Sequence, residues 1–265
     1  MSRQRPIRIG VAGALGRMGG AVVKELAQRS EFTLAALFDR PECEGTGLGD
    51  HTLTSARAAL ALCDAIIDFS AGGASAALAR LAADRGGPAL IIGSTGFSQS
   101  EAATVQAASD RIAIVKSGNF SVGVAVLAAV VEQIARRLGP QNWDIEISEA
   151  HHRQKRDAPS GTALALGEAA ASGRGVKLAD VEAGPRAGAS HLERRHGDIG
   201  FSVMRGGEIV GEHSVVFAGD GEVLTLSHSA RDRRIFALGA LRAAAWIVDR
   251  PPGLYAMTDV LELGD

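Results

Sequence analysis

The first half of the chain alternates short apolar runs with segments of helix length, and this alternation restricts the possible folds more than any other feature. The apolar runs, rich in Ile, Val and Leu, are residues 7–12, 34–38, 65–69, 89–92 and 112–115. Runs this short and unbroken are typical of parallel strands buried on both faces. Alanine-rich helical segments lie among them at 21–28, 74–83 and 101–109. This order predicts right-handed βαβ units in a doubly wound parallel sheet, an α/β fold of the Rossmann-like type.

The second half follows a different pattern. Its residues indicate a long helix over 122–138, a strand with one solvated face at 144–149, a helix over 163–171, a loop over 173–197, a meander of strands at 199–204, 208–217 and 222–229, and a last helix over 234–248 that packs on the first domain. We therefore expect a dinucleotide-binding domain made of residues 1–121 and 233–265. Residues 122–232 would form an inserted α+β domain with an open mixed sheet, which binds the substrate.

Composition and charge argue against several classes of partner. A formal net charge of −2 over 265 residues provides no broad attraction for nucleic acid or for an anionic membrane. No apolar run approaches the roughly 20 residues that span a bilayer, and the first residues do not resemble a secretory signal. Cys43 and Cys63 are too few for a disulfide framework, so we expect reduced cysteines in a cytoplasmic protein.

A glycine-rich turn follows the first expected strand. It reads Gly13-Ala-Leu-Gly16-Arg-Met-Gly19 and leads directly into a helical segment. Glycines at such a turn let backbone N–H groups approach a pyrophosphate, which a helix N-terminus also favours. Asp39, at the end of the second strand, is placed to hydrogen-bond a ribose hydroxyl, whereas the adjacent Arg40 can receive a 2′-phosphate. The sequence therefore predicts a nicotinamide dinucleotide and leaves NADH and NADPH both open.

Two further small-residue turns follow the fourth and fifth expected strands. They are Gly93-Ser-Thr-Gly96 and Ser117-Gly-Asn-Phe120. Both lie at carboxyl ends of strands, the edge where ligands bind in open α/β sheets. Together with the first glycine turn they predict one groove with room for a nicotinamide ring.

The segment 149–163 concentrates groups that hold and protonate an anion. It reads Glu-Ala-His-His-Arg-Gln-Lys-Arg-Asp-Ala-Pro-Ser-Gly-Thr-Ala. The N–H groups of Gly161 and Thr162, at the expected start of a helix, would bind a carboxylate with the help of the helix dipole. Lys155 would add a compact positive charge, and His151 could supply a proton near neutral pH.

A zinc site is the main alternative for these histidines. His151 and His152, completed by His191 or His196, would supply nitrogen ligands for a metal-dependent hydrolase. Adjacent residues of an extended chain point to opposite sides, however, and no cysteine or H-x-x-x-H spacing supports a metal. We therefore expect no bound metal.

The chain resembles the dihydrodipicolinate reductase family over nearly its whole length. The resemblance is carried by 146–163 above all, and in chain order by Gly13-Ala-Leu-Gly-Arg-Met, Gly93-Ser-Thr-Gly, Gly118-Asn-Phe-Ser-Val-Gly, Ile209-Val-Gly-Glu-His and Met257-Thr-Asp-Val-Leu. Ser94 stands where the family commonly has threonine, and Lys116 and Ser117 replace residues that are typically apolar or small. These departures concern the cofactor preference rather than the chemistry.

The resemblance implies a homotetramer assembled through the sheet of the inserted domain, and hydride transfer from NADH or NADPH to a cyclic, imine-type dicarboxylate of lysine and diaminopimelate biosynthesis. It implies that His151 is the proton donor with Lys155 as its catalytic partner. Substrate would be held by His152, Lys155, Gly161, Thr162 and Arg233. Cofactor contacts would come from Gly13, Ala14, Leu15, Gly16, Arg17, Met18, Asp39, Arg40, Gly93, Ser94, Thr95, Ser117, Gly118, Asn119 and Phe120.

Two other functions share the glycine turn. Another two-domain nicotinamide dehydrogenase of amino-acid metabolism would not need the histidine-rich segment, and a non-catalytic NAD(P)H-sensing protein would not need a clustered proton donor. The sequence leaves open whether the substrate is hydrated or dehydrated, and which of His151 and Lys155 releases the proton.

Overall fold

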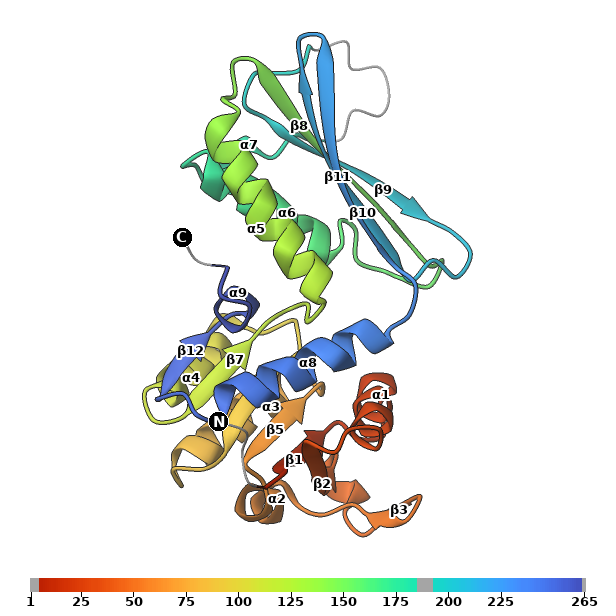
Figure 1. The fold of residues 1–265 in the computed structure, drawn as a ribbon, viewed down its shortest axis with the longest axis vertical. Helices are drawn as coiled ribbons and strands as arrows, with labels where there is room; N and C mark the ends of the chain where they lie inside the picture. Colours follow the sequence, from red (N-terminus) through yellow and green to blue (C-terminus); the bar gives the residue numbers. More distant parts are fainter. Residues whose placement is uncertain (1–4, 185–192, 264–265) are drawn as a thin grey trace. The chain divides into compact units, whose positions relative to one another are not determined.

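The computed structural model of the protein describes residues 5–184 and 193–263 (Figure 1). Its contacts divide the chain into two compact units. Unit 1 comprises Met1–Val122 and Arg233–Asp265, and unit 2 comprises Gly123–Asp232. Each unit has its own sheet, so each is described by itself.

Unit 1 is built on a parallel sheet. Its strands are β1 (Ile7–Ala12), β2 (Phe32–Phe38), β5 (Ala65–Asp68), β6 (Ala89–Ile92), β7 (Ala113–Lys116) and β12 (Gly253–Tyr255). They lie in the order β12-β7-β6-β5-β1-β2, and each neighbouring pair is parallel. The predicted Rossmann-like sheet is confirmed. The chain order reverses between β1 and β5, and in such sheets this point forms a ligand-binding crevice at the carboxyl ends of the strands.

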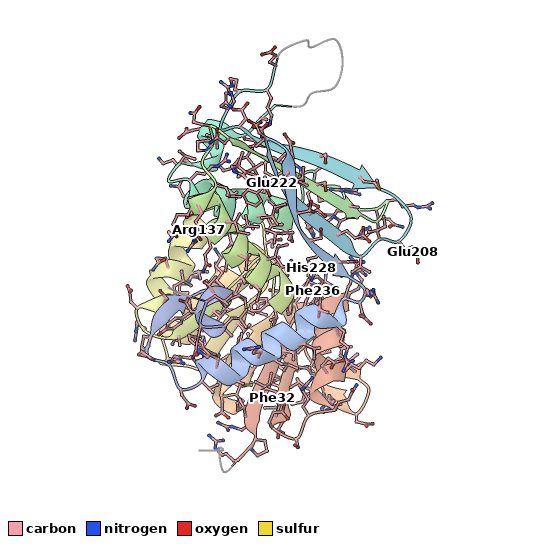
Figure 2. All side chains as sticks on the ribbon, turned by 45° about the horizontal axis from the view of Figure 1, so that its top comes forward. Phe32, Arg137, Glu208, Glu222, His228 and Phe236 are labelled. Atoms are coloured by element: carbon pink, nitrogen blue, oxygen red, sulfur yellow. The ribbon has the colours of Figure 1, made fainter. Side chains whose placement is uncertain are left out.

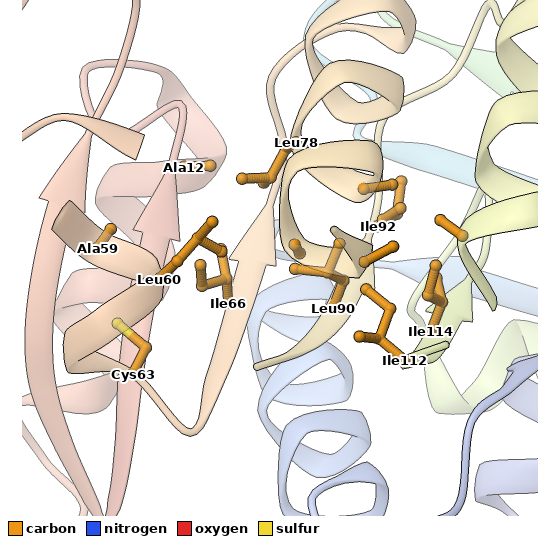
Figure 3. Packing of buried hydrophobic residues seen from close by; sticks show 14 of the residues in the cluster. Ala12, Ala59, Leu60, Cys63, Ile66, Leu78, Leu90, Ile92, Ile112 and Ile114 are labelled. Carbon is orange, nitrogen blue, oxygen red and sulfur yellow. The ribbon is translucent and has the colours of Figure 1, made fainter. Parts of the chain in front are cut away.

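Helices cover both faces of this sheet. They are α1 (Arg17–Leu26), α2 (Ala56–Leu62), α3 (Gly72–Ala83), α4 (Gln99–Ser109) and α8 (Arg234–Ile247). Ile66, Leu90 and Ile114 pack in one apolar cluster with side chains of α2, α3 and α4 (Figure 3). Their neighbours Ile67 and Ile91 are equally buried but lie outside that cluster, and α8 contacts β5, β6 and β7 and packs beside α1. Burial on both faces explains why these strands are continuous apolar runs.

Unit 1 also contains short elements that the apolar pattern does not predict. They are α2, the 3₁₀ turn Pro41–Cys43, the small hairpin of β3 (Gly47–Leu48) and β4 (His51–Thr52), and the edge elements β12 and α9 (Met257–Val260). Helix α2 begins after Ser55, whose hydroxyl accepts a hydrogen bond from the N–H of Ala58 at 3.3 Å. A helix of seven residues is too short to display a helical period, which is why the sequence pattern misses it.

Unit 2 has a mixed sheet with helices on one face. Its elements are α5 (Val122–Arg137), β8 (Trp143–His151), α6 (Gly161–Gly173), α7 (Leu178–Val181), β9 (Ile199–Arg205), β10 (Gly211–Gly219) and β11 (Glu222–Ala230). The sheet order is β11-β10-β8-β9. Strand β10 is antiparallel to both of its neighbours, whereas β9 runs parallel to β8. The predicted open mixed sheet is confirmed.

The predicted meander of the last three strands is wrong. Strands β10 and β11 form a hairpin, but β9 and β10 lie on opposite sides of β8 instead of pairing with each other. The turn signal at 205–207 indicated a local hairpin, yet the connection passes from one side of β8 to the other. This arrangement gives β8 hydrogen-bonding neighbours on both edges, and its Ile145 and Ile147 are fully buried.

The loop predicted over 173–197 is also partly wrong. It contains α7, because the buried Leu178 joins the apolar cluster of α5, α6 and the sheet. The N–H of Ala183 then donates to the carbonyl of Ile199 at 2.9 Å, which ties the end of this segment to β9. Residues 185–192 of the predicted loop lie outside the described residues.

The two faces of the unit 2 sheet differ in character. Ile145, Ile147, Val215 and Phe217 pack against the helices in one buried cluster. The alternate positions carry Ser148, Ser202 and Ser214, together with the exposed Met204 and Val223. Figure 2 shows the side chains of this sheet, with Glu208 in the β9–β10 connection and Glu222 at the start of β11.

Among the described residues, no helix combines the length and the apolar character that crossing a membrane requires.

Candidate active site

The glycine turn of unit 1 has the geometry of an anion-binding loop. Gly13 adopts φ +71°, a left-handed conformation that favours glycine. Gly16 is the N-cap of α1 and makes no side-chain cap, so the first turn of α1 presents backbone N–H groups. A Cβ on Gly19 would lie 2.2 Å from the carbonyl oxygen of Gly13, which shows how closely α1 packs on the turn. The turn and its dipole thus suit the pyrophosphate of a dinucleotide.

Asp39 ties the end of β2 to this glycine turn. Its Oδ2 accepts a hydrogen bond from the N–H of Leu15 at 3.0 Å, and its Oδ1 accepts one from the N–H of Arg40 at 2.9 Å. The Arg40 side chain is 72% exposed, with its Nε 3.7 Å from Asp39 Oδ1. Both residues line a cavity of about 390 Å³ that also includes Gly13, Ser55, Ser70 and Leu78. The structure therefore brings the predicted ribose-binding residues together beside the glycine turn.

The turn after β6 is tightly packed. A Cβ on Gly93 would lie 2.2 Å from the ring of Phe69, so glycine is required at that position. The buried Ser94 places its hydroxyl 2.6 Å from that of Ser75 in α3, whereas Thr95 is exposed. The Ser94 side chain therefore holds the turn against α3, and the Thr95 side chain is left exposed.

The turn after β7 is held by its own side chains. Ser117 Oγ donates to the carbonyl of Asn119 at 2.6 Å, and Asn119 Oδ1 accepts from the N–H of Ser121 at 2.8 Å. Phe120 is buried and meets the ring of Phe69 edge to face, with centroids 5.9 Å apart. This turn packs around a buried ring and is open at Gly118.

Asp68 is a buried acid that was not predicted from the sequence. It ends β5, and its Oδ1 accepts hydrogen bonds from the N–H and the hydroxyl of Ser70, at 2.9 and 2.5 Å. Burial raises the pKa of this carboxyl above its ordinary value. The sequence did contain a signal for Asp68, namely an acidic residue at the end of an otherwise apolar strand. Its hydrogen bonds shape the turn that carries Ser70 into the cavity beside Asp39.

In unit 2, the last residues of β8 carry the predicted proton donor. Glu149 and His151 are two positions apart on a strand, so both side chains lie on the face packed against α6. His151 Nδ1 lies 2.5 Å from Glu149 Oε2, and both residues are buried. Burial lowers the pKa of His151, and the hydrogen bond to Glu149 acts in the opposite direction.

Glu149 is the centre of the hydrogen bonds in this part of unit 2. The guanidinium of Arg205 in β9 donates to both of its oxygens, at 2.7 and 2.8 Å, and the N–H of Ser160 donates to Oε1 at 3.0 Å. Burial on its own would raise the pKa of Glu149, but the hydrogen bonds from Arg205, His151 and Ser160 outweigh it and hold the pKa below its usual value. Glu149 and Arg205 were not predicted as site residues from the sequence, because only the β8–β9 pairing brings them together.

His213 in β10 was also missed. Its Nε2 lies 3.1 Å from the hydroxyl of Ser160, which is the N-cap of α6 and accepts from the N–H of Ala163. Its ring meets that of His151 edge to face, with centroids 5.1 Å apart. Burial, followed by the nearby His151, lowers the pKa of His213 to about 4. Gly161, the first residue of α6, has open space where a side chain would project.

The remaining predicted substrate residues divide between the units. Lys155 forms an ion pair with Asp157 at 2.8 Å, and its charge lowers the pKa of His151. Within the described part of the chain, the buried Nδ1 of His152 has no hydrogen-bond partner. Thr162 is the second residue of α6, whereas Arg233 belongs to unit 1 as the N-cap of α8. Unit 2 therefore brings His151, Lys155 and the start of α6 into one neighbourhood.

The cluster of Glu149, His151 and His213 has the residue types of a metal site, with one ligand atom from each within 4.8 Å of the others. Both Glu149 oxygens already accept N–H groups, two of them from a guanidinium. A cation placed there would face the Arg205 charge and would have to displace these donors. Of the two residues considered as further zinc ligands, His191 lies outside the described residues and His196 is exposed.

Comparison with known proteins gives consistent matches over the whole chain. A family model described as dihydrodipicolinate reductase, N-terminus, matches residues 7–120, and the corresponding C-terminus model matches 123–261. A protein of Caulobacter vibrioides named 4-hydroxy-tetrahydrodipicolinate reductase is 55% identical over 257 residues, which cover 97% of this chain and 98% of that protein. A protein of Rhizobium rhizogenes with the same name is 46% identical over 268 residues, covering 97% of each chain.

Solved structures show the same fold. The dihydrodipicolinate reductase from Paenisporosarcina sp. TG-14, solved with dipicolinate bound, superimposes with a TM-score of 0.76 at 20% identity, over 96% of this chain and 98% of that one. The DAP dehydrogenase of C. glutamicum superimposes with a TM-score of 0.56 at 12% identity, over 96% and 93% of the two chains. The fold is thus shared with proteins whose sequences are distant.

Neighbouring glycines of α1 provide a matched test of the cofactor loop. In Gly19→Ala the new methyl group would collide with the Gly13 carbonyl, so we expect the KM for the dinucleotide to rise by at least about tenfold, or ~1.4 kcal/mol. Gly20→Ala meets nothing within 4 Å, and it should leave that KM unchanged while raising stability by about 0.5–1 kcal/mol. Steady-state kinetics and thermal unfolding measure both effects. Equal KM values for the two variants would contradict the role of Gly19.

Proposed function

Because the chain belongs to the dihydrodipicolinate reductase family, we propose that it catalyses the NAD(P)H-dependent reduction of 4-hydroxy-tetrahydrodipicolinate, or of its dehydrated dihydrodipicolinate form, to tetrahydrodipicolinate in lysine and diaminopimelate biosynthesis. The observation that carries this proposal is the buried Glu149–His151 pair beside Lys155 and the start of α6. The pair supports a proton donor at His151, since positive charge and helix amides lie next to it and suit a dicarboxylate substrate.

The residues of unit 1 fit a nicotinamide dinucleotide. The uncapped first turn of α1 and the left-handed Gly13 would receive the pyrophosphate, and Asp39 and Arg40 line the cavity that would take the adenosine end. Asp39 favours the ribose hydroxyls of NADH, and the exposed guanidinium of Arg40 can bind the 2′-phosphate of NADPH. The turns 93–95 and 117–120 would hold the nicotinamide end. When bound, the cofactor supplies the hydride.

The residues of the substrate half fit a small dianion. The Lys155 ammonium and the N-terminus of α6, with Gly161 and Thr162, favour negative charge, and His152 and Arg233 would supply further donors to the two carboxylates. A bound dianion also stabilises the imidazolium form of His151 against the effect of burial. We therefore assign the proton to His151 and the electrostatic support of its transfer to Lys155.

The assembly would be a cytoplasmic homotetramer. The sheet of unit 2 presents apolar side chains away from its helices, with Met204 61% and Val223 64% exposed. Exposed apolar side chains on a sheet face, here set among Ser148, Ser202 and Ser214, are suited to packing against the same face of another copy.

Met204→Lys tests the assembly. The new charge on the sheet face should shift the protein from a tetramer toward smaller species in sedimentation velocity. Val176→Lys, at an exposed apolar position between α6 and α7, should leave the assembly unchanged. A wild-type protein that sediments as the 27.3 kDa monomer would contradict this proposal.

A coupled assay tests the reaction itself. The upstream synthase generates the substrate in the cuvette, and the oxidation of NADH and of NADPH is followed separately by absorbance. We expect turnover that requires the synthase product, with the ratio of the two kcat/KM values giving the cofactor preference. Absence of synthase-dependent oxidation with both cofactors would refute the proposed function.

Variants of the proton donor and its partner test their assigned roles. His151→Gln should lower kcat by about 100-fold or more with little effect on the KM for the cofactor, because only the proton transfer is lost. Lys155→Ala should lower kcat and raise the KM for the substrate together. The exposed residues His196 and Lys177 supply matched controls, as His196→Gln and Lys177→Ala. Unchanged turnover in His151→Gln would remove His151 from the mechanism.

A further inference from the structure

We infer that Glu149 is the positioning residue of the proton donor. The Glu149 carboxylate is held by two N–H groups of the Arg205 guanidinium and by the amide of Ser160. It accepts a hydrogen bond from the Nδ1–H of His151, and Nε2 of that ring is thereby directed to the substrate. The inference rests on the proposed function, in which His151 protonates the reduced substrate.

The sheet register brings these groups together. In the parallel pairing of β8 with β9, Arg205 stands opposite His151 and reaches back to the Glu149 carboxylate. In the antiparallel pairing of β8 with β10, His213 stands opposite Glu149. Three adjacent strands therefore supply the group that releases the proton and the groups that surround it.

The hydrogen bonds of Glu149 leave a single arrangement for the proton of His151. Oε1 accepts from Arg205 Nη2 at 2.7 Å and from the Ser160 N–H at 3.0 Å. Oε2 accepts from Arg205 Nη1 at 2.8 Å and lies 2.5 Å from His151 Nδ1. A carboxylate has about four acceptor positions, and three are filled by groups that can only donate. Burial would raise the pKa of Glu149, but the hydrogen bonds from the charged Arg205 and from Ser160 hold that pKa below its usual value, so Glu149 is ionised at neutral pH. The fourth position then takes the Nδ1–H of His151, and Nε2 faces away from Glu149.

The surroundings of Nε2 fit this assignment. A Cβ at Gly211 would lie 3.1 Å from that nitrogen, so the absence of a side chain at Gly211 leaves space beside Nε2. The ring of His213 lies edge to face with that of His151, at an interplanar angle of 72°. His213 remains neutral above about pH 5, since its pKa is about 4, and it can accept the hydroxyl proton of Ser160. The ring of His151 is thus held between an anion and a neutral neighbour.

The proton step balances around this pair. A reduced nicotinamide cofactor held by unit 1 would supply the hydride and its electron pair, and the substrate then needs one proton. The Nε2–H bond of the His151 imidazolium breaks as the proton joins the substrate, leaving a neutral imidazole that keeps its Nδ1–H. Glu149 stays ionised throughout and stabilises the imidazolium that must form before the next turnover.

The charges around His151 determine how the pH profile changes. Glu149 of the same strand raises its pKa, whereas Lys155 of the following loop and Arg205 of β9 lower it, and His213 of β10 is neutral. Removing the Glu149 charge leaves burial and the two cations acting together. The pKa of His151 then falls further, and the alkaline limb of the kcat profile moves to lower pH.

Glu149→Gln is the decisive variant. We expect kcat to fall by about 100-fold or more, with the KM for the cofactor unchanged and the alkaline limb of kcat shifted to lower pH. Arg205→Lys keeps the charge but loses the fork, so its kcat should be intermediate. The matched control is Glu146→Gln in the same strand, since Glu146 accepts from Arg194 at 3.0 Å and is not among the groups around His151. Its kinetics should match those of the wild type.

A second measurement does not depend on turnover. Solid-state ¹⁵N NMR of histidine-labelled protein, with the His151 signals identified from His151→Gln, reports which ring nitrogen carries the proton. We expect the Nδ1–H tautomer in the wild type and the Nε2–H tautomer in Glu149→Gln, whose amide can donate to Nδ1. The wild type could lack activity in the coupled assay while the tautomer still differs between the wild type and Glu149→Gln. In that case the proposed function fails and the positioning role of Glu149 stands. Wild-type kcat in Glu149→Gln, or lost kcat with an unchanged tautomer and a lowered Tm, would overturn the inference.

Discussion

The ion pair of Glu149 and Arg205 is the interaction on which the substrate half of the site depends. The Glu149 side chain is completely buried, and a buried carboxylate is tolerated only when its charge is matched and its oxygens are hydrogen-bonded. Arg205 supplies both the charge and the bidentate geometry. The same guanidinium donates to the carbonyl of Asp157 at 2.6 Å, so one side chain connects β9, the end of β8 and the segment that leads into α6. His151, Lys155 and the α6 N-terminus are close together because this connection holds them.

The parallel sheet of unit 1 was predictable because burial on both faces leaves a pattern in the sequence of each strand. A strand covered on both faces, such as the one containing Ile66 and Ile67, must be apolar at consecutive positions, and this pattern is visible without knowledge of its partners. The topology of unit 2 was harder to predict from the sequence. Strand β9 carries turn residues at its end that indicate a hairpin, and only the competition for the edges of β8 determines that β9 pairs parallel to it. Pairing between distant segments leaves little trace in a local pattern.

The residues of the candidate site likewise differ in whether the sequence alone identifies them. His151, Lys155 and the start of α6 lie within one short segment, so the sequence alone associates them with the same chemistry. Glu149 lies two residues before His151 on the same strand face, a relation that the i, i+2 period contains, yet its partner Arg205 is 56 residues away. The neutral state of His213 depends on burial, which a sequence does not record. The residues that perform the chemistry are thus easier to recognise than the residues that orient them.

The position of α8 and β12 in the chain has a consequence for how unit 1 is assembled during synthesis. These elements follow unit 2 in the sequence, yet α8 buries Ala237, Ala240, Ala244 and Ile247 against unit 1, and β12 completes the sheet edge beside β7. While the ribosome is still translating unit 2, the edge of β7 lacks β12, and the face of β5, β6 and β7 that α8 contacts lacks that helix. Unit 1, although most of it is translated before unit 2, is therefore the last to be completed, and its nascent form exposes a sheet edge of the kind that chaperones protect.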